Sequence, residues 1–156
     1  MLGIGGTSMS GIAALLKNYG FYVTGSDANS SELTNKLIDN GIHVVIGHNL
    51  EDLRTANLVV YSAAINYDDL EMQEARRLNI ETIERSAFLG LLTKYFNNTI
   101  CISGTHGKTT TTSMISLAFL EAKKDPTIQV GAILKPINGN YRVGNSDTFI
   151  LESCEY

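Results

Sequence analysis

A short loop near position 106 carries the residue types that bind phosphate. It lies between an apolar run and a helical pattern, and its residues are Gly104, Thr105, His106, Gly107, Lys108, Thr109 and Thr110. Glycines let backbone N–H groups turn toward an anion, and the following helix adds the positive end of its dipole. A lysine after the second glycine reaches the β- and γ-phosphates, and the next hydroxyl ligates Mg²⁺. These residues predict a nucleoside triphosphate site.

The spacing of this loop departs from the usual G-x-x-x-x-G-K-[ST] form. Position 102 is Ile, so only two residues separate the glycines at 104 and 107. The strand–loop–helix context still favours a nucleotide site over a plain helix start with a surface lysine. For His106, both a structural role and a functional role remain alternatives.

A second glycine-rich loop opens the chain. It resembles the dinucleotide fingerprint G-x-G-x-x-G, but Ser8 replaces the third glycine, and Gly11 comes one helical turn too late for that role. Asp27 ends the next predicted strand, where an acidic residue binds a ribose hydroxyl in dinucleotide enzymes. We predict that backbone amides and a helix N-terminus here bind a diphosphate, with a turn that binds no ligand as the alternative. The loop residues concerned are Gly5, Gly6, Ser8, Met9, Ser10 and Gly11.

Three further residues follow predicted strands. His48 and Ser62 stand at carboxyl ends, the edge at which open α/β sheets bind ligands. Glu152 ends a strand in the second half, where a carboxylate commonly holds Mg²⁺. The alternative for His48 is an exposed loop residue, for Ser62 a tight loop, and for Glu152 a lone acid that binds no metal. The charged run 71–77 is interpreted as the solvated face of a helix.

Alternating elements must position these residues. Short apolar runs at 2–5, 21–25, 43–46, 58–61 and 80–83 alternate with helical patterns, which predicts a parallel sheet with right-handed crossovers. The pattern restarts near 96, and we place a boundary there between domains 1–96 and 97–156. The second part shows strands at 99–103, 128–132 and 148–152, one helix, and a Gly/Asn-rich hairpin or loop at 138–145. The fold class is therefore α/β.

Composition excludes several classes of protein. The 156 residues are 44% hydrophobic, which is too apolar for disorder driven by charge, and the net charge of -4 is unlike that of a nucleic-acid binder. No apolar run reaches the ~18–20 residues of a membrane span, and the opening residues do not resemble a signal peptide. Cys101 and Cys154 predict buried thiols in a cytoplasmic protein.

Together the two loops and the acidic strand end resemble the Mur ligase family. The supporting stretches cover the whole chain: 3–11, 25–27, 46–48, 61–65, 104–112 and 151–155. The resemblance implies a Rossmann-like UDP-sugar-binding domain followed by the start of a P-loop ATPase domain. The family phosphorylates the carboxylate of UDP-N-acetylmuramate with ATP and Mg²⁺, and the amine of an amino acid such as L-alanine then attacks the acyl phosphate.

The resemblance also assigns roles to residues. The diphosphate would lie over 5–11, with Asp27, His48 and Ser62 near the nucleotide. Lys108 would stabilise the transferring phosphoryl group, with His106 beside it, and Thr109 with Glu152 would hold Mg²⁺. Cys154 replaces a family Asp, so the roles of Cys154 and Glu155 are open.

Alternatives to this ligase function remain. They are a UDP-sugar-binding module without catalysis, and a related ligase that adds a tripeptide during muropeptide recycling. A nicotinamide enzyme is disfavoured by the loop at 104–110 and by the missing third glycine of the opening loop. Because the family extends well beyond this length, we expect no ligase turnover from these 156 residues alone. The acceptor amino acid and the oligomeric state are left open.

Overall fold

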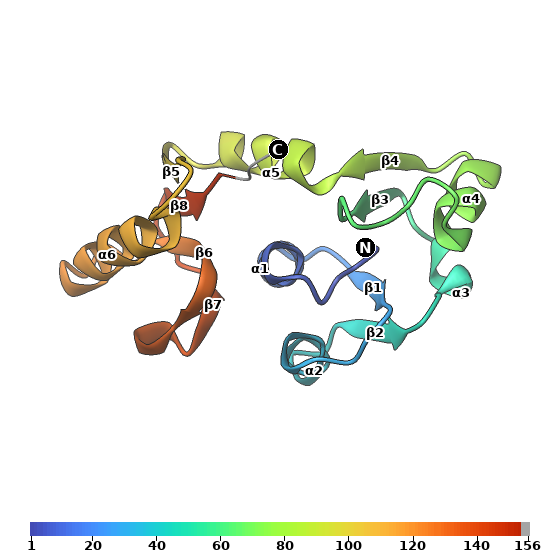
Figure 1. Cartoon of the computed structure of the whole chain (residues 1–156), viewed down its shortest axis with the longest axis horizontal. Helices are drawn as coiled ribbons and strands as arrows, with labels where there is room; N and C mark the ends of the chain where they lie inside the picture. The colour runs from blue at the N-terminus through green and yellow to red at the C-terminus, as the bar shows by residue number, and fades with distance from the viewer. Residues whose placement is uncertain (154–156) are drawn as a thin grey trace. The chain divides into compact units, whose positions relative to one another are not determined.

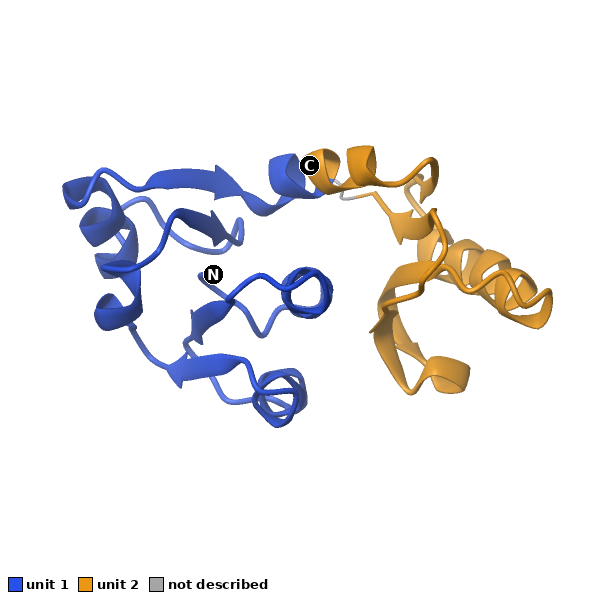
Figure 2. Ribbon diagram, turned by 180° about the vertical axis from the view of Figure 1, so that it is seen from behind, with its two compact units in different colours: residues 1–89 blue, residues 90–156 orange. Residues whose placement is uncertain are grey.

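A computed structural model describes residues 1–153 of the chain, which divides into two compact units. Unit 1 comprises residues 1–89 and unit 2 residues 90–156, as Figure 2 shows by colour. Helices and parallel strands make up both units, which confirms the predicted α/β class. The functional assignment of domains 1–96 and 97–156 stays a prediction. Within the described residues, no helix is long and apolar enough to cross a membrane.

Unit 1 alternates helices with four short strands (Figure 1). Its elements are α1 (Thr7–Asn18), β1 (Thr24–Asp27), α2 (Glu32–Asp39), β2 (His43–Ile46), α3 (Leu50–Leu53), β3 (Leu58–Tyr61), α4 (Leu70–Arg77), β4 (Glu81–Glu84) and α5 (Arg85–Leu92), of which α5 continues into unit 2. Strand β1 begins at Thr24, later than the predicted 21–25. Phe21 and Tyr22 are 61% and 87% exposed, so they do not belong to the buried strand.

The first residues of the chain join two strand pairs into one sheet. Strand β1 pairs with β2 and β3 with β4, all in parallel, and Leu2 forms parallel bridges with Ser26 of β1 and Tyr61 of β3. The N–H of Leu2 donates to Val60 O (2.9 Å), and that of Ser26 donates to Met1 O (3.0 Å). The strand order β2–β1–Leu2–β3–β4 therefore reverses at the chain start. Such a reversal is the kind of switch point at which doubly wound sheets bind ligands.

Two apolar clusters hold the helices of unit 1 to this sheet. One is built around Ile4 and contains side chains of α1 and α2, and the other is built around Leu2 and contains side chains of α3 and α4. The members of the clusters are Ile4, Ala13, Val23, Leu37 and Ile42 in the first, and Leu2, Leu53, Val59, Met72 and Ala75 in the second. Both clusters thus depend on the central segment.

Unit 2 is a four-stranded sheet with one long helix. Strands β5, β8 and β6 are parallel, and β7 adds antiparallel to β6 in the order β5–β8–β6–β7. The elements are η1 (Thr93–Tyr95), β5 (Asn98–Ile102), α6 (Lys108–Glu121), β6 (Thr127–Leu134), η2 (Lys135–Ile137), β7 (Gly139–Arg142) and β8 (Thr148–Glu152). The segment 138–145, expected as a hairpin or loop, contains β7, which forms an antiparallel hairpin with β6.

The prediction of a buried thiol is wrong for Cys101, which is exposed. The residue lies on β5, an edge strand of the sheet. An apolar strand pattern does not reveal whether its outer side is covered, so the sequence overestimated burial here. Cys154 and Glu155 lie outside the described residues.

A polar clamp fixes the turn before β8. Asp125 accepts hydrogen bonds from the Arg142 guanidinium and from the backbone and side-chain nitrogens of Asn145, the latter two at 3.0 Å. Arg142 also donates to Pro126 O (2.8 Å). The hydrogen bond from Arg142, followed by those from Asn145, lowers the pKa of the Asp125 carboxyl from 3.8 to about 2. This ion pair therefore ties β7 and the turn after it to the start of β6.

Replacing Gly25 by Ala should destabilise unit 1. A Cβ at this position would lie 2.6 Å from Ile4 Cδ1 and 2.7 Å from Met1 O, and a backbone oxygen has little room to move. We expect a loss of about 1–3 kcal/mol, as for other overpacked sites. Urea unfolding of the variant measures it. The control is Gly90→Ala in α5, where a Cβ would meet no described atom within 4 Å and alanine favours a helix by ~1 kcal/mol. Equal loss in both variants would contradict the steric argument.

Asp125 should make unit 2 sensitive to acid. Because the folded carboxyl has the lower pKa, the unfolded chain takes up more protons as pH falls. The stability from this group is complete above about pH 4 and is lost as pH falls through about 2. Asp125→Asn should lower the melting temperature at neutral pH and flatten its dependence over this range, measured by thermal unfolding at a series of pH values. An unchanged slope would show that the clamp does not contribute.

Candidate functional site

The loop after Leu2 reaches the carboxyl edge of the sheet in unit 1. The N–H of Gly5 donates to Asp27 Oδ2 (2.8 Å), and the N–H of Asn29 donates to Asp27 Oδ1 (3.1 Å). Helix α1 starts after Gly6, an N-cap residue that brings no side-chain acceptor, and its first turn contains no acid. The helix dipole thus presents a positive end that an anion would stabilise.

Glycine is required at two positions of this loop. Gly3 has a φ of +73°, and a Cβ there would lie 3.1 Å from Ser62 Cβ. At Gly5 a Cβ would lie 2.8 Å from Asp27 Oδ2 and 2.7 Å from Thr34 Cγ2. The structure therefore brings together the loop, Asp27 and Ser62, which come from three different strand ends.

Other predicted binding residues have structural surroundings. The side chains of Met9 and Ser10 are buried within α1, as is Gly11, and Ser10 Oγ donates to Thr7 O (3.0 Å). The backbone at the start of α1, and not these two buried side chains, is therefore placed to meet a ligand. Arg85, which the sequence did not single out, donates to Ser8 Oγ (3.2 Å) and puts a guanidinium beside this turn.

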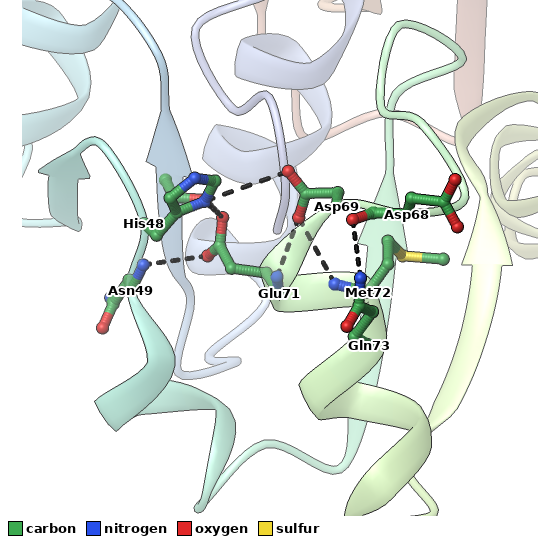
Figure 3. A network of polar contacts seen from close by, with 8 residues as sticks. His48, Asn49, Asp68, Asp69, Glu71, Met72 and Gln73 are labelled. Atoms are coloured by element: carbon green, nitrogen blue, oxygen red, sulfur yellow. Dashed lines mark hydrogen bonds and ion pairs between the residues drawn. The ribbon is translucent and has the colours of Figure 1, made fainter.

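His48 lies beside two carboxylates that were missed from the sequence (Figure 3). Its Nδ1 is 3.4 Å from Glu71 Oε2 and 3.9 Å from Asp69 Oδ2. Glu71 is only 4% exposed, so the interpretation of 71–77 as a solvated face is wrong at this residue. Helical spacing could have revealed it, because Glu71 lies four residues before Ala75 on the buried face of α4.

These three residues also have the chemistry of metal ligands. One candidate ligand atom from each of His48, Asp69 and Glu71 lies within 4.8 Å of the others. Their carboxylates already accept protein hydrogen bonds, however: Asp69 caps α4 through the N–H of Glu71 (2.8 Å), and Glu71 accepts from Ser26 Oγ (2.8 Å). Contacts within the protein therefore explain the cluster.

In unit 2, the Gly104–Thr110 loop folds around its own lysine. Gly104 and Gly107 have φ values of +146° and +79°, and Gly107 is the N-cap of α6. Lys108 Nζ donates to Gly104 O (2.5 Å), while His106 is exposed. The ammonium group thus lies across the loop, close to where the turned backbone would meet phosphates.

Thr109 and Glu152 come together at the start of α6. Thr109 Oγ1 donates to Glu152 Oε2 (3.1 Å), and Glu152 Oε1 accepts from the N–H of Gly131 (2.7 Å). A Cβ at Gly131 would lie 2.9 Å from Glu152 Oε2 and 3.2 Å from Thr109 Oγ1, so glycine lets the backbone approach the pair this closely. A hydroxyl and a carboxylate in contact supply oxygen ligands of the kind that Mg²⁺ takes.

Comparison with known proteins identifies the family. Residues 1–97 match the model described as Mur ligase family, catalytic domain. The UDP-N-acetylmuramate–L-alanine ligase of Clostridium botulinum (strain Kyoto / Type A2) is 55% identical over 155 residues, which are 99% of this chain and 34% of that protein. The chain thus spans about a third of the length of the curated relatives it matches.

Two solved structures have the same fold. UDP-N-acetylmuramate-alanine ligase from Thermotoga maritima has a TM-score of 0.90 at 30% identity. The match covers 97% of this chain and 35% of the Thermotoga chain. The UDP-N-acetylmuramate:L-alanyl-gamma-D-glutamyl-meso-diaminopimelate ligase from Neisseria meningitides has a TM-score of 0.87 at 28% identity. The match covers 99% of this chain and 52% of the Neisseria chain. The resemblance expected from the two loops is therefore confirmed, and the chain belongs to the Mur ligase family.

Proposed function

We propose that this chain contributes the UDP-sugar site and the first part of the ATP site of a ligase that joins L-alanine to the carboxylate of UDP-N-acetylmuramate in peptidoglycan synthesis. The observation that carries the proposal is the presence of two separate glycine-rich loops, each at a strand end before a helix with a glycine N-cap, in one chain of the Mur ligase family. The need for ATP and a nucleotide sugar indicates a cytoplasmic protein.

Support for the UDP-sugar site comes from the switch point in unit 1. Gly5 and Gly6 lead into the uncapped start of α1, where Arg85 adds a positive charge beside Ser8. A diphosphate carries the negative charge that such a site stabilises. Asp27, a hydrogen-bond acceptor, suits a ribose hydroxyl better than a phosphate, because two anions repel each other.

Support for the ATP site comes from the Gly104–Thr110 loop of unit 2. Backbone N–H groups of 104–110 and the ammonium group of Lys108 would bind the β- and γ-phosphates, and Thr109 with Glu152 would hold Mg²⁺. When bound, the ion neutralises charge on the phosphate oxygens. Lys108 must leave Gly104 O to reach a phosphoryl oxygen, which its flexible side chain permits.

The proposed reaction activates a carboxylate in two steps. The muramate carboxylate oxygen attacks the γ-phosphorus of ATP, the bond to the β-phosphate oxygen breaks, and ADP leaves. The amine of L-alanine then attacks the acyl carbon, loses a proton, and expels inorganic phosphate as the amide forms. Lys108 stabilises the negative charge on the phosphoryl oxygens during the first step.

Two other functions remain as alternatives. The Neisseria relative bears the name of a ligase for a tripeptide-sized acceptor, and its structure is close to this one. Curated relatives that are 49–55% identical bear the name of the L-alanine ligase, which favours L-alanine as the acceptor. A UDP-sugar-binding module without catalysis is disfavoured by the pairing of Thr109 with Glu152, which such a module does not need.

The UDP-sugar site predicts a binding measurement. Calorimetric titration of the 156-residue chain with UDP-N-acetylmuramate should give heat, and Gly5→Ala should weaken binding about tenfold or more, because the new methyl group displaces Asp27 and Thr34. Gly90→Ala is the control and should bind as the wild type does. Absence of heat with the wild-type chain would contradict a UDP-sugar site in these residues.

The ATP site predicts a separable defect. In a protein of the length of the curated relatives, Lys108→Ala should reduce kcat for phosphate release about a hundredfold or more, the usual cost of removing a group that stabilises transition-state charge. Binding of UDP-N-acetylmuramate should not change. Lys124→Ala, an exposed lysine beyond α6, is the control. If Lys108→Ala abolished both phosphate release and binding of UDP-N-acetylmuramate, the division into two sites would be wrong.

A further inference from the structure

The carboxylate of Glu71 is a buried acceptor shared by three segments. Its Oε1 accepts from the N–H of Asn49 (3.1 Å), and its Oε2 accepts from Ser26 Oγ (2.8 Å). Ser26 belongs to β1. Asn49 follows β2, and Glu71 itself lies in the first turn of α4 (Figure 3). One side chain thus fixes the carboxyl ends of two neighbouring strands.

The same carboxylate faces the ring of His48. Nδ1 of His48 is 3.4 Å from Glu71 Oε2 and 3.9 Å from Asp69 Oδ2. Asp69 is itself held in place, since its Oδ1 accepts from the N–H groups of Glu71 and Met72 (2.8 and 3.3 Å). Ionised carboxylates only accept hydrogen bonds, so the ring nitrogen between them has to carry a proton.

This arrangement determines what His48 offers to a ligand. With Nδ1 directed at the carboxylates, Nε2 is the nitrogen left for a ligand, and 48% of the side chain is exposed. Nε2 accepts from a hydroxyl when the ring is neutral and donates to a phosphate oxygen when the ring is charged. Both partners occur in a UDP-sugar.

The backbone connects His48 to the predicted diphosphate site. Gly47, the residue before His48, donates its N–H to Asp27 O (2.8 Å). Asp27 in turn accepts from the N–H of Gly5 (2.8 Å). The ring and the glycine-rich loop are therefore fixed to the same strand end.

We propose that Glu71 is a positioning residue that, with Asp69, holds His48 as the Nδ1–H tautomer and so presents Nε2 to the UDP-sugar. The part of this proposal that concerns the ligand rests on the proposed function, whereas the tautomer is a property of the protein alone. Glu71 does not contact the ligand in this scheme and acts through His48.

Glu71→Gln is the sharpest variant, because glutamine has the same shape but a single acceptor oxygen. Both carboxylate oxygens of Glu71 accept hydrogen bonds, so one donor must face the new NH₂ group in either orientation of the amide. Glu74→Gln is the matched control. It removes the same charge from the same helix, but Glu74 pairs with Arg77 on the surface.

The experiment combines NMR with calorimetry on the 156-residue chain. Two-bond ¹H–¹⁵N spectra of histidine-labelled protein, at a pH where the ring is neutral, report the tautomer, and His48→Gln assigns the signal among the three histidines. We expect Nδ1–H in the wild type and in Glu74→Gln, and loss of this preference in Glu71→Gln. UDP-N-acetylmuramate should bind about tenfold more weakly to Glu71→Gln, the effect of about one hydrogen bond.

The outcomes separate this proposal from the proposed function. An Nε2–H tautomer in the wild type overturns the positioning role and needs no variant, so the test holds even if Glu71→Gln does not fold. Wild-type tautomer or wild-type affinity in a folded Glu71→Gln also overturns it. If the wild type shows Nδ1–H but does not bind UDP-N-acetylmuramate, the proposed function fails while the assigned tautomer stands.

Discussion

The backbone hydrogen bonds of residues 1–3, made to strands on both sides, are the constraint on which unit 1 depends: Leu2 bonds to Val60 and Ser62, whereas Met1 and Gly3 bond to Ser26. They join the β1–β2 and β3–β4 pairs, which have no direct strand pairing to each other among the described residues. They also place the following glycines at the point where the strand order reverses, and the side chains of Leu2 and Ile4 anchor both apolar clusters. Sheet, core and candidate site therefore share one short segment.

Close packing around this segment explains why its neighbours are small. Gly25 lies against Ile4 and the Met1 carbonyl, and Gly5 lies against Asp27 and Thr34. A backbone that approaches so closely leaves no room for a Cβ at these two positions. Adjacent residues of β1 add polar contacts, because Asp27 accepts from the N–H of Gly5 and Ser26 Oγ donates to Glu71.

The sequence predicted what depends on local chemistry and missed what depends on tertiary contact. Glycine spacing and the Lys108–Thr109 pair were recognisable because loop, strand end and helix start are adjacent in the chain. The buried state of Glu71 was missed because its partners Ser26 and Asn49 are 45 and 22 residues away. The exposure of Cys101 was missed because an edge strand has the same apolar sequence pattern as a central strand.

In each candidate loop one backbone group forms a hydrogen bond with a charged side chain, but the two side chains have opposite charges. In unit 1 an anion, Asp27, accepts from the loop N–H of Gly5, whereas in unit 2 a cation, Lys108, donates to the loop carbonyl of Gly104. A phosphate entering the second loop attracts Lys108 and needs only a rotation of its flexible side chain. A diphosphate at the first loop would be repelled by Asp27 at short range, so it must bind on the α1 side and leave the carboxylate to a neutral hydroxyl donor. In the proposed function, the opening loop would therefore favour a ligand that carries both a diphosphate and a sugar hydroxyl, and the loop at 104–110 would favour phosphate charge alone.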